Sequence, residues 1–302
     1  MALGIGDDGA VIDPDPAMQL VVATDTLVES VHFPADASAE QIATRALCVN
    51  LSDMAAMGAR PKWFTLALTI PSDKANAQWL GDFSRGLAEV AAEFDIALVG
   101  GDTTAGPLTI SITLMAEVPT GKALKRSGAK VGDGIYVTGH LGDGAAALAL
   151  ITDNTDIKDV SGYLLERFYR PRPMVEEGIA LRDIASACID ISDGLIADLE
   201  HICKASGVSA KLYTENLPIH PDMAEMSSQH CVSWALSGGD DYQLCFTVPP
   251  SQKKKIDHFV RLGELKATLV GHIEPDKESR ELVTVDGQSA TKKNRGYDHF
   301  GQ

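Results

Sequence analysis

A short apolar run ends in glycine and aspartate at Ile96-Ala97-Leu98-Val99-Gly100-Gly101-Asp102-Thr103. Such a run predicts a buried strand, and the glycines after it predict a loop. Two further apolar runs, Leu20-Val21-Val22-Ala23 and Cys188-Ile189, are also followed by aspartate. Aspartate beside a small or polar residue recurs in both halves of the chain, within Gly6-Asp7-Asp8-Gly9, Thr24-Asp25-Thr26, Asn50-Leu51-Ser52-Asp53, Asp190-Ile191-Ser192-Asp193-Gly194 and Gly238-Gly239-Asp240-Asp241. The pattern predicts strands that end in acidic loops.

These aspartates predict a site for cations. Carboxylates that a fold gathers at strand ends repel one another unless positive charge lies between them. A ligand set made only of oxygen suits Mg²⁺, which binds through a few carboxylates, water and substrate phosphates. A single aspartate beside glycine is more often a cap or a turn residue, so the argument depends on the repeated set. We therefore expect a magnesium-dependent enzyme that acts on phosphates.

Length and composition are those of an ordinary globular protein with two domains. The chain has 302 residues, of which 45% are hydrophobic and 23% charged, and a single core of that size is unusual. No apolar stretch has the length of a membrane span, and no secretory signal is visible at the N-terminus. The cysteines are scattered and form no Cys-x-x-Cys pair: Cys48, Cys188, Cys203, Cys231 and Cys245. This usage is typical of reduced thiols in the cytoplasm.

The formal net charge of −16 argues against a nucleic-acid partner, because contacts to a phosphate backbone need clustered Lys and Arg. The same charge does not exclude a nucleotide substrate, since bound Mg²⁺ would reverse the local field. We expect neither nucleic acid nor a membrane among the partners. Much of the acidic excess is expected on a solvated surface.

Strands and helices alternate in the first part of the chain. Strands are expected at residues 18–24, 63–70, 96–99 and 108–118, and helices at 38–58 and 76–94. The first helix opens with Ser38-Ala39-Glu40-Gln41, which has the pattern of a capping box, and ends at Gly58. The alternation predicts an α/β layer.

The periodicity is interrupted at residues 119–130, where Pro119, Gly121 and Gly128 accompany a group of basic residues. We place a domain boundary there, with domains at residues 1–120 and 121–302. In the second domain, strands are expected at 135–137, 208–212, 243–248, 268–273 and up to Ile191, and helices at 143–151, 174–184 and 194–205. The predicted fold class is α/β (α+β) with two domains.

Glycine-rich segments match nucleotide-binding patterns without the context that those patterns need. Residues 4–11 match the dinucleotide and protein-kinase patterns, but no strand can precede them, and Asp7 and Asp8 would repel a phosphate. The turn Gly142-Asp143-Gly144 is a better dinucleotide candidate, and a turn that serves only packing explains it equally well. Neither a P-loop nor a Ca²⁺-binding EF-hand loop occurs in the sequence.

Three further segments have two interpretations each. His32 is a substrate contact or a loop histidine, and its closeness to Asp25 favours the contact. Arg126 is a solvated linker charge or a clamp for a phosphate. The run Lys253-Lys254-Lys255 is better explained as a solvated helix start than as a binding patch. Cys, Ser and His show no nucleophile-elbow or triad spacing, so we expect no covalent nucleophile.

Together these segments resemble the thiamine-monophosphate kinase family, a member of the ATP-binding superfamily of aminoimidazole ribonucleotide synthetase and selenophosphate synthetase. The resemblance extends from Gly4 to Phe300. Its motifs are Gly6-Asp7-Asp8, Thr24-Asp25-Thr26-Leu27-Val28 with His32-Phe33, Asn50-Leu51-Ser52-Asp53-Met54-Ala55-Ala56-Met57-Gly58, Gly100-Gly101-Asp102-Thr103-Thr104, Arg126-Ser127-Gly128-Ala129, Asp190-Ile191-Ser192-Asp193-Gly194-Leu195, Ser237-Gly238-Gly239-Asp240-Asp241-Tyr242 and Gly296-Tyr297-Asp298-His299-Phe300.

The resemblance implies an aminoimidazole ribonucleotide synthetase-like fold with an N-terminal sheet domain that forms a homodimer and a C-terminal α/β domain. It implies transfer of the γ-phosphoryl group of ATP to thiamine monophosphate, which gives thiamine diphosphate. Residue roles are implied by position. Mg²⁺ would be held by Asp8, Thr24, Asp25, Asp53, Asp102, Asp190 and Asp193, ATP would contact Gly101, Asp102, Arg126 and Ser192, and the thiamine end would contact His32, Asp240 and Phe300. The family usually has Glu at the position of Asp240.

The acceptor in such a reaction is a phosphate monoester, whose oxygen is already anionic near neutral pH. Direct in-line transfer therefore needs no strong general base, and alignment with charge neutralisation is sufficient. Two alternatives stay open: a synthetase of the same superfamily that acts on purine precursors, and a non-catalytic regulator that binds a nucleotide or a metal.

Overall fold

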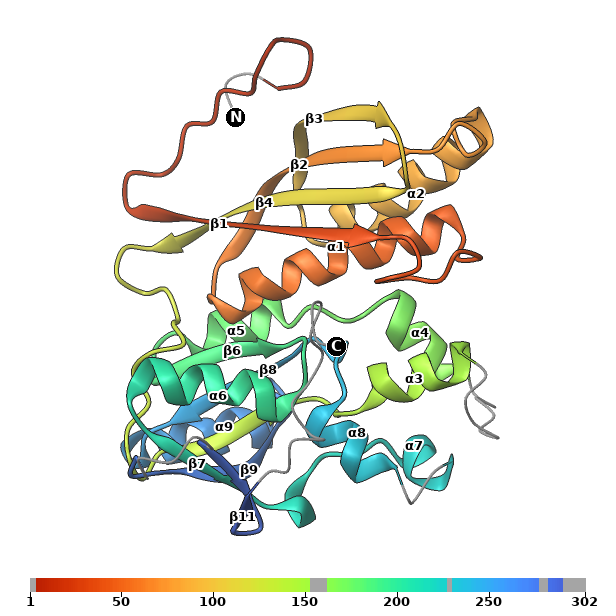
Figure 1. The fold of residues 1–302 in the computed structure, drawn as a ribbon. Helices are drawn as coiled ribbons and strands as arrows, with labels where there is room; N and C mark the ends of the chain where they lie inside the picture. Colours follow the sequence, from red (N-terminus) through yellow and green to blue (C-terminus); the bar gives the residue numbers. More distant parts are fainter. Residues whose placement is uncertain (1–3, 153–161, 227–229, 277–281, 290–302) are drawn as a thin grey trace. The chain divides into compact units, whose positions relative to one another are not determined.

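The computed structural model describes residues 4–152, 162–226, 230–276 and 282–289 (Figure 1). The chain forms two compact units: unit 1 comprises Met1–Met54 and Ala59–Ala123, and unit 2 comprises Ala55–Gly58 and Leu124–Gln302. Each unit has its own sheet. Among the described helices, none combines the length and the apolar character that crossing a lipid bilayer requires.

Unit 1 is a four-stranded sheet with helices against one face (Figure 1). Its elements are β1 (Met18–Val28), α1 (Ala39–Ala56), β2 (Arg60–Ile70), α2 (Ala77–Glu93), β3 (Ala97–Ala105) and β4 (Thr109–Pro119). The strand order is β1-β4-β2-β3, in which β4 pairs antiparallel with β1 and β2, and β2 pairs parallel with β3. β1 and β3 are therefore the edge strands of this sheet.

Strand β4 confirms the alternation that the sequence predicts. Ile110, Ile112 and Leu114 are fully buried, whereas Ser111 and Thr113 on the opposite face are only partly buried. Alternate residues of a strand point to opposite faces, so one face of the sheet is apolar and faces the helices. The other face is lined by hydroxyl groups.

The start of α1 confirms the predicted capping box. The backbone N–H of Gln41 donates to Ser38 Oγ at 3.2 Å, and the backbone N–H of Ser38 donates to Gln41 Oε1 at 2.9 Å. This pair satisfies two N–H groups that a helix start leaves without an intrahelical partner. Helix α2 begins in a similar way, because Asn76 Oδ1 accepts from the N–H of Trp79 at 3.0 Å.

Two acidic segments that the sequence predicts as loops after strands, at Asp25 and Asp102, lie inside strands instead, whereas Asp53 lies within the helix expected at residues 38–58. Asp25 is in β1, Asp53 is in α1 and Asp102 is in β3. Strand β1 continues past Asp25 because its pairing with β4 persists to Val28, and threonines on either side of Asp25 favour the strand. The prediction that Asp25 and Asp102 lie in loops after strand ends was wrong.

Unit 2 contains a seven-stranded sheet in the order β11-β10-β7-β9-β5-β8-β6. Its strands are β5 (Gly134–Thr138), β6 (Ala187–Ile191), β7 (Ser209–Leu212), β8 (Gln243–Val248), β9 (Ala267–Glu274), β10 (Val283–Val285) and β11 (Gln288–Ser289). The helices are α3 (Asp143–Ile151), α4 (Tyr163–Tyr169), α5 (Val175–Leu181), α6 (Leu195–Ser206), α7 (Pro221–Met226), α8 (Cys231–Ser237) and α9 (Lys253–Leu262). The main core packs α6 against β5, β6 and β7.

Most predicted elements of unit 2 are confirmed, including α9, which begins at the lysine run. The sequence did not predict α4, α7 or α8, which have only 7, 6 and 7 residues. Helices of so few turns show only a weak hydrophobic periodicity in the sequence, and packing against larger elements decides whether these helices form. All five cysteines are buried, and none of them is in a disulfide.

We predict that Ser38→Ala lowers the free energy of unfolding by about 1 kcal/mol, because the cap of α1 loses its acceptor for the Gln41 N–H. The shift of the thermal unfolding midpoint measures this loss. Ser84→Ala is the matched control, since Ser84 is exposed within α2, where alanine favours the helix slightly. Equal midpoints for the two variants would contradict the capping role.

Candidate active site

In unit 1, a buried asparagine joins β1 to α1 beside two predicted metal ligands. Asn50 is fully buried, its Oδ1 accepts from the backbone N–H of Asp25 at 3.2 Å, and its Nδ2 donates to Ala46 O at 2.9 Å. Asp53 lies three residues after Asn50, on the same side of α1. The structure thus places Asp25 next to the part of α1 that carries Asp53.

Thr24 points away from this position. Its Oγ1 is 2.8 Å from Thr113 Oγ1 on the hydroxyl-lined face of the sheet, whereas neighbouring residues of a strand point to opposite faces. The side chains of Thr24 and Asp25 are therefore on different faces of β1. Of this pair, the carboxylate is the group that faces α1.

Two other predicted ligands of unit 1 are exposed. Asp8 precedes β1, and its N–H donates to Asp7 Oδ1 at 2.9 Å. Asp102 lies in the edge strand β3, and its Oδ1 accepts from the N–H of Thr103 at 2.9 Å. Before it, Gly101 packs so closely against β2 that a Cβ would lie 2.0 Å from Leu66 O. Only glycine fits at position 101, so no side chain covers the backbone next to Asp102.

His32 is held at two atoms. Its Nδ1 accepts from the backbone N–H of Val28 at 3.0 Å, and its carbonyl oxygen accepts from Nε of Arg45 at 3.1 Å. Arg45 is 2% exposed. An accepting Nδ1 places the proton of the neutral ring on Nε2. His32 therefore carries a hydrogen-bond donor at Nε2.

In unit 2, a buried aspartate that the sequence analysis missed organises the segment 192–194. Asp198 Oδ2 accepts from the backbone N–H groups of Ser192, Asp193 and Gly194 at 3.0, 3.0 and 3.1 Å. The contact bends the chain between β6 and α6 around one carboxyl group. An acidic residue in the first turn of a helix after an acidic loop is the sequence signal that could have identified it.

The acids around this turn crowd one another. Asp190 and Asp198 are 7% and 3% exposed. Burial, and after it the charge of Asp190, raises the pKa of Asp198 to about 8, although the N–H groups of Ser192 and Asp193 lower it. Repulsion of this kind is relieved by a divalent cation near the carboxylates. The donor set at Asp190 and Asp193 therefore fits a hard cation such as Mg²⁺.

The segment 237–242 lies directly against this turn. The N–H of Asp240 donates to Ser192 O at 2.9 Å, and the N–H of Tyr242 donates to Ile191 O at 2.8 Å. Tyr242 also donates from its hydroxyl to Asp240 Oδ1 at 2.9 Å. The structure thus joins a residue predicted to contact ATP, Ser192, with one predicted to contact the thiamine end, Asp240.

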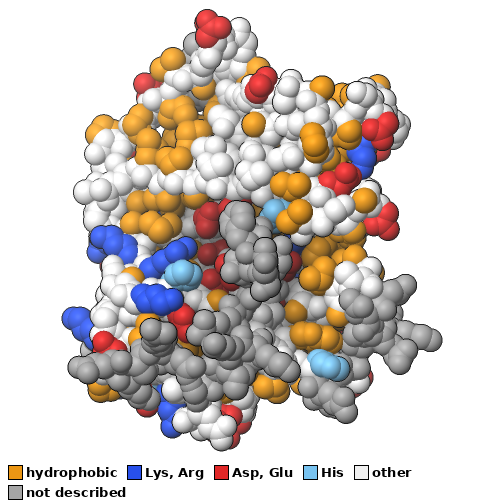
Figure 2. Space-filling view, viewed as in Figure 1, with side chains coloured by type: hydrophobic (Ala, Val, Ile, Leu, Met, Phe, Trp, Pro, Cys, Tyr) orange, Lys and Arg blue, Asp and Glu red, His pale blue; other side chains and the backbone are white. Residues whose placement is uncertain are grey.

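Arg126 lies near α6. Its carbonyl oxygen accepts from Ser206 Oγ at 3.4 Å, and its side chain is exposed. Burial, and after it the charges of Arg126 and Lys204, lowers the pKa of His201. Figure 2 shows Lys and Arg side chains gathered around a histidine over this part of unit 2. An anionic group is attracted to such a surface.

The turn at residues 142–144 is not a dinucleotide loop. The N–H groups of Gly142 and Gly144 donate to the carboxyl group of Asp241 at 2.7 and 3.1 Å. Their donors are therefore occupied by a protein acid instead of a pyrophosphate. The interpretation that this turn serves packing is the one that the structure supports.

The predicted site residues belong to both units: Asp8, Thr24, Asp25, His32, Asp53, Gly101 and Asp102 to unit 1, and Arg126, Asp190, Ser192, Asp193 and Asp240 to unit 2. Within the described ranges, no three His, Cys, Asp or Glu side chains form a metal-binding group. Phe300 and the motif at residues 296–300 lie outside the described residues.

Comparison with known proteins identifies the family. Residues 6–118 match AIR synthase related protein, N-terminal domain, and residues 130–283 match AIR synthase related protein, C-terminal domain. The chain is 46% identical over 302 residues to thiamine-monophosphate kinase of Salmonella typhimurium, covering 98% of this chain and 91% of that protein. The chain belongs to the thiamine-monophosphate kinase family. The kinase of Bacillus subtilis is 35% identical, with coverage of 99% and 93%.

Solved structures confirm the predicted fold class. Thiamine-monophosphate kinase from Stenotrophomonas maltophilia superposes with a TM-score of 0.87 at 43% identity, covering 95% of this chain and 92% of that one. A structure of AaThiL complexed with AMPPCP and TMP has a TM-score of 0.84 at 31% identity, with coverage of 98% and 92%. The hydrogenase maturation protein HypE of E. coli, at 21% identity and a TM-score of 0.75 with coverage of 96% and 91%, shares the fold.

We predict that Asp198→Ala destabilises the protein by about 2–4 kcal/mol, because it leaves N–H groups of the 192–194 turn without an acceptor. Asp198→Asn keeps an acceptor oxygen for these N–H groups and cannot ionise, so it should unfold close to the original temperature. Thermal unfolding of both variants measures the difference. A similar loss in both variants would show that the charge, and not the accepted hydrogen bonds, is what the turn needs.

Proposed function

We propose that this protein is a thiamine-phosphate kinase, which transfers the γ-phosphoryl group of ATP to the phosphate of thiamine monophosphate and forms thiamine diphosphate. The observation that carries the proposal is 46% identity to a thiamine-monophosphate kinase over 98% of the chain. A relative of 31% identity was solved as a complex with AMPPCP and TMP. The geometry supports the same chemistry, because the turn with Ser192 and Asp193 is hydrogen-bonded to the segment with Asp240.

The proposed ligands of the required divalent metal are the carboxylates Asp8, Asp25, Asp53, Asp102, Asp190 and Asp193, and the proposed ion is Mg²⁺. These groups offer only oxygen, which suits Mg²⁺ better than a softer metal. When bound, the ion neutralises charge as one phosphate approaches another. Thr24, whose hydroxyl lies 2.8 Å from that of Thr113, completes the proposed set.

The remaining roles are proposed by position. Gly101, Asp102, Arg126 and Ser192 contact ATP, and His32, Asp240 and Phe300 contact the thiamine end. The position of Arg126 on a basic surface beside α6 supports its proposed contact with ATP. The hydrogen-bond donor of His32 at Nε2 supports its proposed contact with the thiamine end. Transfer is direct, because an ionised acceptor needs no general base and no residue has the spacing of an activated nucleophile.

We also propose a homodimer formed through the sheet of unit 1, the domain that we place at residues 1–120. Its hydroxyl-lined face carries Leu20 and Val22 of β1, which are 49% and 59% exposed. Thr24 and Thr26 follow on the same face. Exposed apolar residues on an uncovered sheet face support burial against a second copy.

We propose a reducing, cytoplasmic location, which is supported by five buried cysteines that form no disulfide.

We predict that the purified protein converts thiamine monophosphate to thiamine diphosphate with ATP and Mg²⁺, and that excess EDTA abolishes turnover. Asp53→Asn should lower kcat by about two orders of magnitude or more, because it removes a group that organises charge in the transition state. Product formation is followed by chromatography. Full turnover in EDTA would contradict the metal requirement, and turnover of a purine precursor in place of thiamine monophosphate would contradict the substrate.

We predict that Asp240→Ala raises KM for thiamine monophosphate about tenfold and changes KM for ATP less than about twofold, as expected for loss of one charge-assisted contact. Asp240→Glu restores the residue usual in the family and should retain activity. Steady-state kinetics with each substrate varied in turn separates the two constants. An effect on ATP alone would place Asp240 at the nucleotide instead of the acceptor.

A further inference from the structure

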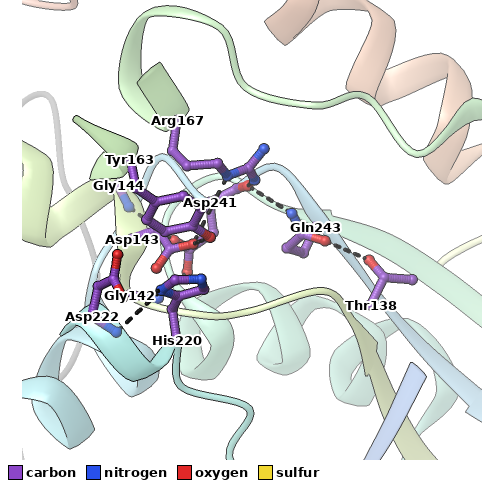
Figure 3. A network of polar contacts seen from close by, with 10 residues as sticks. All are labelled: Thr138, Gly142, Asp143, Gly144, Tyr163, Arg167, His220, Asp222, Asp241 and Gln243. Atoms are coloured by element: carbon purple, nitrogen blue, oxygen red, sulfur yellow. Dashed lines mark hydrogen bonds and ion pairs between the residues drawn. The ribbon is translucent and has the colours of Figure 1, made fainter. Parts of the chain in front are cut away.

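A buried network in unit 2 is not explained by any role assigned above (Figure 3). It begins at Asp241, which is 2% exposed. The carboxyl group of Asp241 accepts from the N–H of Gly142 at 2.7 Å and from the N–H of Gly144 at 3.1 Å. These N–H groups lie at the start of α3, where donors have no intrahelical partner and an acid is favoured. Asp241 therefore ties its own segment, 237–242, to α3.

The contact between α3 and this segment is a close backbone contact. A Cβ on Gly144 would lie 2.5 Å from the carbonyl carbon and oxygen of Asp240, and one on Gly238 would lie 2.4 Å from Ala145 Cβ. On its other side, a Cβ on Gly239 would lie 2.6 Å from Ser192 O. The segment is therefore held between α3 and the 192–194 turn. A displacement of α3 changes the position of Asp240.

Helix α4, which packs against α3, completes the network. Tyr163 donates from its hydroxyl to Asp143 Oδ2 at 2.5 Å, and Arg167 Nε lies 3.8 Å from the same oxygen (Figure 3). Arg167 Nη2 also donates to Asp241 O at 3.4 Å. With its amide oriented to satisfy both neighbours, Gln243 accepts from Arg167 Nη2 at 2.8 Å. One helix thus contacts Asp143, Asp241 and the start of β8.

Both contacts from α4 to Asp143 go to the same carboxyl oxygen, Oδ2. Asp143 is 1% exposed, and its Oδ1 is buried with no hydrogen-bond partner among the residues that the structure describes. The carboxyl group therefore depends on Oδ2, where Tyr163 is the short contact and Arg167 the long one. Burial, and after it the charge of Asp143, raises the pKa of Asp241 well above its usual range. Removing the Tyr163 hydroxyl leaves a buried charge poorly compensated.

We propose that Tyr163 and Arg167 are positioning residues for the acceptor substrate, which act through Asp143 and Asp241 to hold the segment 237–242 and so present Asp240. The inference rests on the proposed function for the identity of the substrate. In this proposal Tyr163 and Arg167 contact only protein groups and act on the substrate through them. Asp240 has φ of 67° and Tyr242 has φ of 50°, a conformation that non-glycine residues keep only when their surroundings impose it.

The first test compares Tyr163→Phe with Glu166→Gln, a control on the exposed side of the same helix. Tyr163→Phe should raise KM for thiamine monophosphate about tenfold, in line with one lost hydrogen bond to a charged group, with kcat and KM for ATP within about twofold. Glu166→Gln should change none of these. Equal increases in both KM values, or no change in either, would overturn the proposal.

A double-mutant cycle tests whether Tyr163 acts through Asp143. Tyr163→Phe should have no further effect on KM for thiamine monophosphate when combined with Asp143→Ala, because the Tyr163 hydroxyl then has no side-chain oxygen of residue 143 to donate to. Additive effects would overturn the proposed route. Arg167→Lys keeps the charge and loses the fork that reaches Asp241 and Gln243, so it should shift the same constant in the same direction.

Hydrogen exchange gives a readout that does not need turnover. In the protein without substrates, Tyr163→Phe should speed amide exchange in residues 238–242 several-fold, while exchange in β4 of unit 1 stays unchanged. Unchanged exchange in 238–242 would overturn the positioning role, whatever the substrate is. Failure of the unmodified protein to convert thiamine monophosphate, with the exchange result as expected, would instead overturn the proposed function and leave the network as the support of segment 237–242.

Discussion

Asp198 and Asp241 each use one buried carboxyl group to collect backbone N–H groups from a neighbouring turn. Asp198 accepts from three such groups and Asp241 from two. A buried carboxyl group is costly unless it is hydrogen-bonded, so each acid fixes the backbone that supplies its donors. The two turns that result flank the segment with Asp240, and the candidate chemistry of unit 2 depends on them.

This arrangement suits direct phosphoryl transfer. Two anionic phosphates react only when their alignment is maintained and their charge is compensated. Glycines at 142, 144, 194, 238 and 239 let the backbones approach within contact distance, which leaves little freedom for the segments between them. The 192–194 turn holds Asp193, which we propose with Asp190 as a ligand of a divalent metal, and such an ion would lower the mutual repulsion of these acids.

Local patterns predicted much of the fold. The capping box at Ser38, the alternation in β4 and the bounds of α3 and β8 were predicted correctly, because each depends on neighbouring residues. The loop predictions for Asp25 and Asp102 were wrong. A ladder of hydrogen bonds to β4 extends β1 through Asp25, and pairing with β2 extends β3 through Asp102. The length of such a strand depends on the strands that pair with it, and a short stretch of sequence does not contain those partners.

The sequence by itself determined the family and the chemistry, because the aspartate motifs specify which carboxylate oxygens are available as ligands and in which order they occur along the chain. Tertiary structure alone decided that Asp241 binds the start of α3, 99 residues away along the chain, and that Tyr163 reaches Asp143, 20 residues before it. It also decided that Thr24 and Asp25 face opposite sides of β1. These contacts depend on how the backbone segments pack against one another, and the identity of the residues alone does not specify that packing.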